Sequence, residues 1–153
     1  SFTSATALSV TATLASGAYY VRVENNDGNA GRSANAIITA STAPTWTTSA
    51  GSLGTIAGDF SGTVATVAAT SDSAITYSEV SSPAVLIGSG SGQANCTLDS
   101  STGVIATTDF GGSSTTATLY TFTLRATDAE GQTADRVFTL QSSFGATGGG
   151  QFN

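Results

Sequence analysis

Residues 120–131 have the sequence Tyr-Thr-Phe-Thr-Leu-Arg-Ala-Thr-Asp-Ala-Glu-Gly, and this stretch decides the fold class. Apolar side chains alternate with polar ones from Tyr120 to Ala126, which is the two-residue period of a β-strand with one buried face. An acidic turn follows, and Gly131 supplies the position of positive φ that a tight hairpin needs. A second alternating run over residues 133–140 predicts the returning strand.

The same pattern occurs once more, near the start of the chain. Tyr19-Tyr-Val-Arg-Val-Glu-Asn-Asn-Asp-Gly28 aligns with residues 122–131 at a constant offset of 103 residues, so that Arg22 falls on Arg125 and Gly28 on Gly131. A spacing of about 100 residues is the length of one immunoglobulin-like domain. The repeat therefore predicts that the terminal hairpin of such a domain appears twice.

The two hairpins set the predicted domain boundaries. Residues 43–141 contain enough short candidate strands for an immunoglobulin-like antiparallel β-sandwich. Residues 1–42 hold only about three candidate strands, too few to cover both faces of a core. We predict that they are the C-terminal strands of an incomplete immunoglobulin-like domain, either part of a longer polypeptide or completing a sheet supplied by another chain. Residues 142–153 are predicted to be a Gly-rich linker or tail.

The composition favours an all-β protein without catalytic chemistry. Ser, Thr and Gly are abundant among the 153 residues, helix-forming residues are scarce, and no helical apolar period is visible. Lysine and histidine are absent, which removes most of the side chains used for acid–base, Schiff-base and imidazole–metal chemistry. We predict no enzyme activity, no catalytic residue, no cofactor and no metal site.

Charge and hydropathy exclude two classes of partner. The 4 basic residues are all arginines and stand against 10 carboxylates, for a net charge of -6, so no nucleic-acid partner is expected. No run of about 18 apolar residues is present, and the first residues lack the pattern of a signal peptide, so no membrane insertion is expected. The single cysteine leaves the fold without an intramolecular disulfide.

Three elements of residues 43–141 resemble a known family. They are Ile75-Thr-Tyr-Ser78, Leu98-Asp-Ser-Ser-Thr-Gly-Val-Ile105 and the stretch from residue 120 to 131. In this order they are similar to immunoglobulin-like and dystroglycan-type cadherin-like repeats. Residues 16–28 resemble the close of an immunoglobulin-like domain of the plexin and transcription-factor type. The resemblance implies modular stalks, bacterial adhesins, and the fibres, spikes and surface proteins of phages and other viruses.

The resemblance also implies candidate calcium ligands, because cadherin-type repeats bind Ca²⁺ in loops between domains. A hard cation needs six or more oxygen ligands. Here the family's motif is incomplete, since two serines follow Asp99 where an acidic ligand belongs, and no Asp-x-Asn-Asp-Asn linker is present. The default prediction is therefore solvated turn carboxylates. The candidates are Asp99, Asp72, Asp128 and Glu130.

Polar residues elsewhere have structural predictions. Asp27, beside Asn25 and Asn26, is expected to shape a hairpin turn rather than to bind a ligand. Arg22 and Arg125 are expected to pair across the sheet with partners such as Glu24 or Asp135. Cys96 lies in the glycosylation sequon Asn95-Cys-Thr97, and we predict that it is a small apolar side chain in the sheet.

The aromatic residues are also predicted to be structural. Trp46, at the start of the second domain, is expected to pack on the interdomain junction or under one end of the sandwich, the alternative being a sugar-stacking platform. Tyr19 and Tyr120 lie near the start of their strands and are candidates for the corner tyrosine of Greek-key sandwiches.

Two functions of different class are consistent with the sequence. In the first, the chain is a non-enzymatic structural and interaction module of a virus particle, such as a phage fibre, spike or capsid-decorating protein, and contacts other copies of itself or neighbouring virion proteins. In the second, it is an adhesion module of a secreted bacterial surface protein, with calcium or host-surface glycan contacts in the loops of residues 71–74, 88–95 and 109–116. Both place it on a virion surface or outside the cell.

Overall fold

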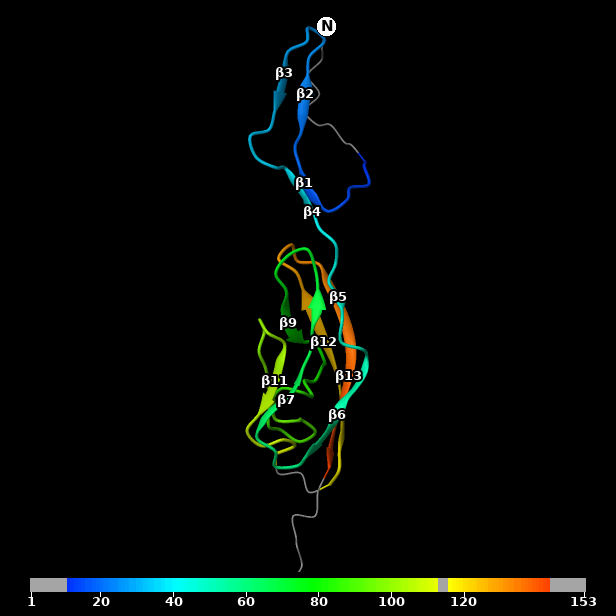
Figure 1. Ribbon diagram of the computed structural model, residues 1–153, viewed down its shortest axis with the longest axis vertical. Coiled ribbons are helices and arrows are strands. Elements are labelled where there is room, and N and C mark those ends of the chain that lie inside the picture. Colours follow the sequence, from blue (N-terminus) through cyan, green and yellow to red (C-terminus); the bar gives the residue numbers. More distant parts are fainter. Residues whose placement is uncertain (1–10, 113–115, 144–153) are drawn as a thin grey trace, which may run out of the picture. The chain divides into compact units, whose positions relative to one another are not determined.

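The computed structural model describes residues 11–112 and 116–143, and this part of the chain is all-β without a helix. It divides into two compact units, Ser1–Thr42 and Ala43–Asn153. The larger unit is an immunoglobulin-like β-sandwich, which confirms the predicted fold class (Figure 1).

The first unit is one long, interrupted hairpin. Strands β1 (Gly17–Tyr19) and β4 (Ile38–Ala40) pair antiparallel, and so do β2 (Arg22–Glu24) and β3 (Ala30–Arg32). Gly28, with φ of 86°, closes the turn between β2 and β3 as predicted. The alternating pattern of residues 18–24 predicts one strand, but in the structure that strand is broken at residues 20–21. No side chain within residues 11–42 is buried, so the hairpin has no core of its own.

One layer of the second unit is a four-stranded sheet in the order β6-β13-β12-β9. Its centre is the predicted hairpin, β12 (Leu119–Thr127) with β13 (Thr133–Ser143), in which Phe122 lies opposite Phe138. The edges are β9 (Thr76–Glu79), antiparallel to β12, and β6 (Gly51–Ala57), parallel to β13. The sandwich is thus antiparallel except at the β6 edge.

The other layer is a three-stranded sheet in the order β10-β11-β7, formed by β10 (Cys96–Leu98), β11 (Val104–Thr107) and β7 (Gly62–Thr66). A short pair, β5 (Thr45–Trp46) with β8 (Ala69–Thr70), completes the unit. The apolar run Ala84-Val-Leu-Ile87 predicts a buried strand, but no strand forms there. These residues form a loop that touches β10 through one isolated bridge, between Ile87 and Cys96.

The core lies between the two sheets and combines inward side chains of the strands with side chains from the loops, among them Leu86 and Phe110. Burying one large apolar side chain, such as a leucine or a phenylalanine, stabilises the fold by about 1.5–3 kcal/mol relative to leaving it exposed. The most deeply buried large side chains are Phe110, Phe122, Phe138, Leu86, Ile105, Leu124, Leu140 and Val67.

The Leu-Asp-x-x-Thr-Gly-x-Ile element is the turn from β10 to β11. The Asp99 carboxylate accepts hydrogen bonds from the backbone N–H groups of Thr102 (2.8 Å) and Ser101 (2.9 Å), and these bonds lower the pKa of Asp99. Gly103 has φ of 69°, and a Cβ there would overlap the carbonyl oxygen of Val67. The motif is conformational: it shapes a turn and lets two backbones approach closely.

Candidate functional site

Three of the four candidate calcium ligands lie together in the second unit. Asp72 comes from the loop between β8 and β9, while Asp128 and Glu130 come from the turn between β12 and β13. One carboxylate oxygen of each lies within 4.8 Å of those of the other two. Asp99, the fourth candidate, lies in the β10–β11 turn and is not part of this carboxylate cluster.

Asp128 is placed by the hairpin that the sequence predicts. Its backbone N–H donates to the carbonyl of Gln132 (3.0 Å), and its Oδ1 accepts from the N–H of Gln132 (2.7 Å). The N–H of Gly131, where φ is 86°, donates to the carbonyl of Asp128 (3.1 Å). The residue as a whole is only 5% exposed, and these hydrogen bonds fix its position in the turn.

Ser73 joins the two loops that carry the carboxylate cluster. Its hydroxyl donates to Oε2 of Glu130 (2.5 Å) and accepts from the backbone N–H of Ala129 (3.1 Å). The sequence analysis did not single out Ser73, because a serine beside an aspartate in a Ser-rich chain carries no distinguishing signal. Ser73 thus ties its own loop to residues 56 and 57 positions further along the chain.

The chemistry of the carboxylate cluster fits a hard divalent cation. Three carboxylates so close together repel one another when all are ionised, and a cation between them relieves that repulsion. Calcium takes six to eight oxygen ligands, including carboxylates and backbone carbonyls, whereas zinc sites are built mainly from Cys and His. Asp72, Asp128 and Glu130 would supply the carboxylate part of such a shell.

Trp46 lies in the core, as predicted, and forms no sugar platform. It is 6% exposed, and its ring packs against Tyr77 and Phe138 with centroids 5.7 and 5.3 Å apart. Its indole N–H donates to the carbonyl oxygen of Ala134 (3.0 Å). The apolar ring of Trp46 is therefore packed, and its indole N–H is hydrogen-bonded, inside the sandwich.

The sequon residues are occupied by structural contacts. Asn95 adopts φ of 57°, and its side-chain amide donates to the carbonyl of Asp109 (2.8 Å). Cys96 is 3% exposed, which confirms the expected apolar role. Burial raises the pKa of its thiol to about 12, so the nucleophilic thiolate is not populated near neutral pH.

The arginines pair locally. Arg125 binds Asp135 through two hydrogen bonds, from Nε (2.7 Å) and Nη2 (2.8 Å), and these bonds lower the pKa of the Asp135 carboxyl. This is the cross-strand pair that the sequence predicts. Arg22 pairs with Glu24 (3.0 Å) along the same strand rather than across the sheet.

The two candidate corner tyrosines differ. The hydroxyl of Tyr19 donates to the carbonyl of Ala15 (2.6 Å), four residues upstream. The hydroxyl of Tyr120 makes no hydrogen bond within the described residues, so the corner-tyrosine prediction is wrong at that position. Asp27 accepts from the backbone N–H (3.0 Å) and the side-chain amide (3.2 Å) of Asn29, which is the expected turn role.

Comparison with known proteins identifies the architecture. No protein-family model matches the chain, and no curated protein matches its sequence. Solved structures do match. A cis-dimeric fragment of protocadherin gammaB7, EC3-6, matches with a TM-score of 0.53 and 15% sequence identity, and the match covers 67% of this chain and 26% of that one. Drosophila N-cadherin EC1-4 matches with a TM-score of 0.52 and 15% identity, covering 81% of this chain and 32% of that one. The human Desmocollin-1 ectodomain matches with a TM-score of 0.51 and 17% identity, covering 78% of this chain and 24% of that one.

These likenesses define a cadherin-like, immunoglobulin-like β-sandwich. The chain spans about a quarter to a third of the length of these three structures. The described part of the chain contains no helix that is long and apolar enough to cross a membrane.

Proposed function

We propose that this protein is a non-enzymatic structural and interaction module of a surface assembly, of the kind that forms phage fibres, spikes or capsid-decorating proteins. Its partners are other copies of itself or neighbouring surface proteins, on a virion or outside a cell. One structural neighbour, the protocadherin gammaB7 fragment, is itself a cis-dimer. This supports self-association by cadherin-like sandwiches in general.

The exposed apolar side chains of the β1–β4 hairpin carry the proposal. Val23 and Ile37 are 62% and 60% exposed, and Val21 and Ile38 are 44% and 49% exposed. A two-stranded hairpin is marginally stable alone in water. Four apolar side chains on a hairpin without a buried residue favour packing against another protein surface, because burying each contributes about 1.5–3 kcal/mol.

The molar mass of the purified chain tests self-association. We expect light scattering to show an oligomer, and we expect V23D with I37D to convert it to a monomer by placing two carboxylates in the interface. V137D is the matched control, because Val137 is 48% exposed on β13 of the other unit and should leave the oligomer intact. A wild-type chain that is monomeric at all concentrations would contradict the proposal.

The carboxylate cluster favours a second candidate function, a calcium-dependent adhesion module of a secreted bacterial surface protein. Glycan contacts belong to the same alternative. Its support is the convergence of Asp72, Asp128 and Glu130 within 4.8 Å in a cadherin-like sandwich. In this function Ca²⁺ neutralises the cluster and links the β8–β9 loop to the β12–β13 turn.

Calcium titration tests this second function. We expect millimolar Ca²⁺ to raise the melting temperature, EDTA to reverse the rise, and binding to add about 1.4 kcal/mol of stability when the free ion is at ten times its Kd. D72N with E130Q should abolish the shift. D99N is the control, because Asp99 lies outside the cluster and should leave the shift unchanged. A wild-type melting temperature indifferent to both Ca²⁺ and EDTA would rule the site out.

A further inference from the structure

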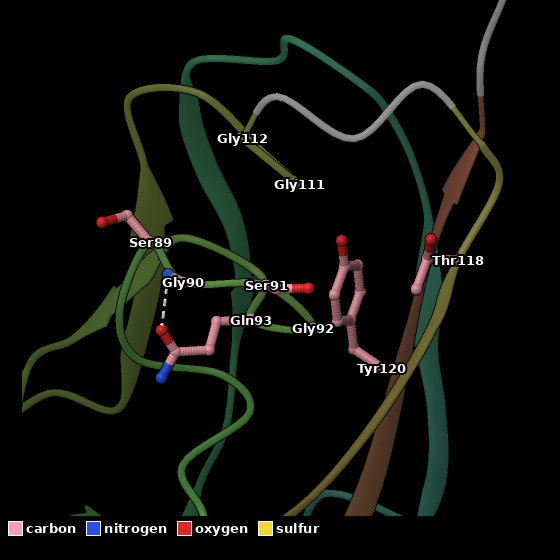
Figure 2. A pocket seen from close by; sticks show the side chains of 9 residues that line it. All are labelled: Ser89, Gly90, Ser91, Gly92, Gln93, Gly111, Gly112, Thr118 and Tyr120. Atoms are coloured by element: carbon pink, nitrogen blue, oxygen red, sulfur yellow. Dashed lines mark hydrogen bonds between the residues drawn. The ribbon is translucent and has the colours of Figure 1, made fainter.

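A polar pocket lies at the start of β12, whereas the carboxylate cluster lies beyond its end. The pocket has a volume of about 440 Å³, within the range of small-molecule sites. It lies between the loop of residues 89–93, the backbone at residues 111–112, and the side chains of Thr118 and Tyr120 (Figure 2). The loop of residues 89–93 thus faces the segments on either side of residues 113–117 across one space.

Glycines and one glutamine shape the loop side of the pocket. The side-chain oxygen of Gln93 accepts from the N–H of Gly90 (2.6 Å), and its amide donates to the carbonyl of Ala84 (3.2 Å). A Cβ at Gly90 would lie 2.7 Å from that glutamine oxygen. A larger residue at Gly90 would displace the Gln93 side chain, which these two hydrogen bonds hold in place.

The hydroxyl of Tyr120 is the unusual feature of the pocket. The residue is only 2% exposed, and its ring packs edge-on against Phe110 with centroids 5.7 Å apart. Buried hydroxyls are nearly always hydrogen-bonded, yet this one has no partner within the described residues. No side-chain polar atom that is sealed from solvent in the described part lacks a partner, so the Tyr120 oxygen is open to the pocket.

Gly111 keeps the space above this hydroxyl open. Its backbone N–H donates to the carbonyl of Ala94 (3.0 Å), its φ is 76°, and a Cβ there would lie 3.2 Å from the Tyr120 oxygen. Figure 2 shows the Ser91 hydroxyl on the opposite side, directed toward Tyr120. Two hydroxyl groups therefore face one volume, and both can donate and accept hydrogen bonds.

Among the described residues, the lining contains no charged side chain, and it offers hydroxyl groups, one carboxamide and glycine backbone. A pocket of this kind has no counter-ion for a phosphate, a carboxylate or a cation, and the net charge of -6 repels anions further. It suits a neutral ligand that presents many hydroxyl groups. We propose that this pocket binds a neutral saccharide and that the Tyr120 hydroxyl hydrogen-bonds a sugar hydroxyl at its floor.

The binding is expected to be weak, because the described lining offers no exposed aromatic face for stacking and the contacts are neutral hydrogen bonds. A dissociation constant on the order of millimolar corresponds to about 4 kcal/mol. The inference deepens the adhesion alternative but uses neither the carboxylate cluster nor the β1–β4 hairpin. Saccharide binding can therefore fail while self-association and calcium binding hold, and the reverse.

NMR titration of the ¹⁵N-labelled chain tests the proposal. The probes are glucose, galactose and N-acetylglucosamine, with glucose 6-phosphate as the charged counterpart, and dextran to separate a chain-borne sugar from a free one. We expect saturable shifts at the amides of residues 89–93, 111–112 and 118–120 with at least one neutral sugar, and none with glucose 6-phosphate. Shifts with dextran as well indicate a chain-borne ligand, and shifts with the free sugar alone indicate a soluble one.

Y120F is the decisive variant, because it removes only the hydroxyl and no hydrogen bond of the folded protein. We expect it to weaken saccharide binding roughly three- to tenfold and to leave the melting temperature unchanged. Y19F is the matched control and should bind as the wild type does. The proposal is overturned if no neutral sugar causes shifts at 50 mM, if the shifts lie outside the pocket, or if Y120F binds as tightly as the wild type.

Discussion

Trp46→Ala is expected to lower the free energy of unfolding by roughly 3–5 kcal/mol, the range for deleting a large buried aromatic side chain. The ring contacts Tyr77 and Phe138, so its loss leaves a cavity between the two layers. The carbonyl of Ala134 also loses its indole donor. Urea unfolding followed by far-UV circular dichroism measures the change, because the variant no longer contains the chain's only tryptophan.

Trp46→Phe separates packing from hydrogen bonding. It keeps an aromatic ring between Tyr77 and Phe138 and removes the indole N–H, so we expect a smaller loss, of about 1–3 kcal/mol. Trp46→Ala with a loss below about 1 kcal/mol would mean that the ring is not part of the core. In that case the sugar-platform interpretation of Trp46 would have to be reconsidered.

The centre of the sandwich was predictable because its alternation has only one physical interpretation. Phe122, Leu124 and Leu140 follow a strict two-residue period, and a shift of one position would expose all of them. Gly131 then fixes the hairpin turn, since φ of 86° is strained for other residues. Local pattern and tertiary burial agree in this segment, so one sequence window was sufficient.

The loop of residues 84–87 was not predictable from the same kind of pattern. Ala84-Val-Leu-Ile87 is an apolar run, which indicates a buried strand. In the structure only Leu86 is fully buried, and three successive backbone N–H groups bind a carboxylate instead of a neighbouring strand. A side chain six to eight residues upstream thus replaces a strand partner, and no periodicity records that.

The candidate sites, too, were predictable from the sequence only in part. Acidic residues in loops were found from the sequence, because turns favour Asp and Glu at such positions. Which of them meet depended on Ser73, which bonds both Glu130 and Ala129 across the sandwich end. The pocket at Tyr120 depends on glycines and on a hydroxyl without a described partner, and neither feature has a sequence signature.

Glu79→Ala is expected to cost roughly 3–5 kcal/mol, because hydrogen bonds to a charged group contribute about 1.5–3 kcal/mol each and water replaces only some of them. Oε1 accepts from the N–H groups of Val85 (2.7 Å) and Leu86 (2.9 Å), and Oε2 accepts from that of Ile87 (2.9 Å). Removing the carboxylate leaves three adjacent donors beside the buried Leu86 side chain. The loop then loses the anchor that positions Leu86 in the core.

A graded series distinguishes this anchoring role from a general effect of charge. Glu79→Gln keeps one acceptor oxygen, so it should retain the bonds to Val85 and Leu86, lose the bond to Ile87, and cost about half as much. Ser78→Ala, on the same strand with an exposed side chain, should change little. Urea unfolding gives the global change, and amide hydrogen exchange at residues 85–87 gives the local one. Glu79→Ala with wild-type exchange at these amides would show that the carboxylate does not hold the loop, whereas faster exchange there than in the wild type would confirm that it does.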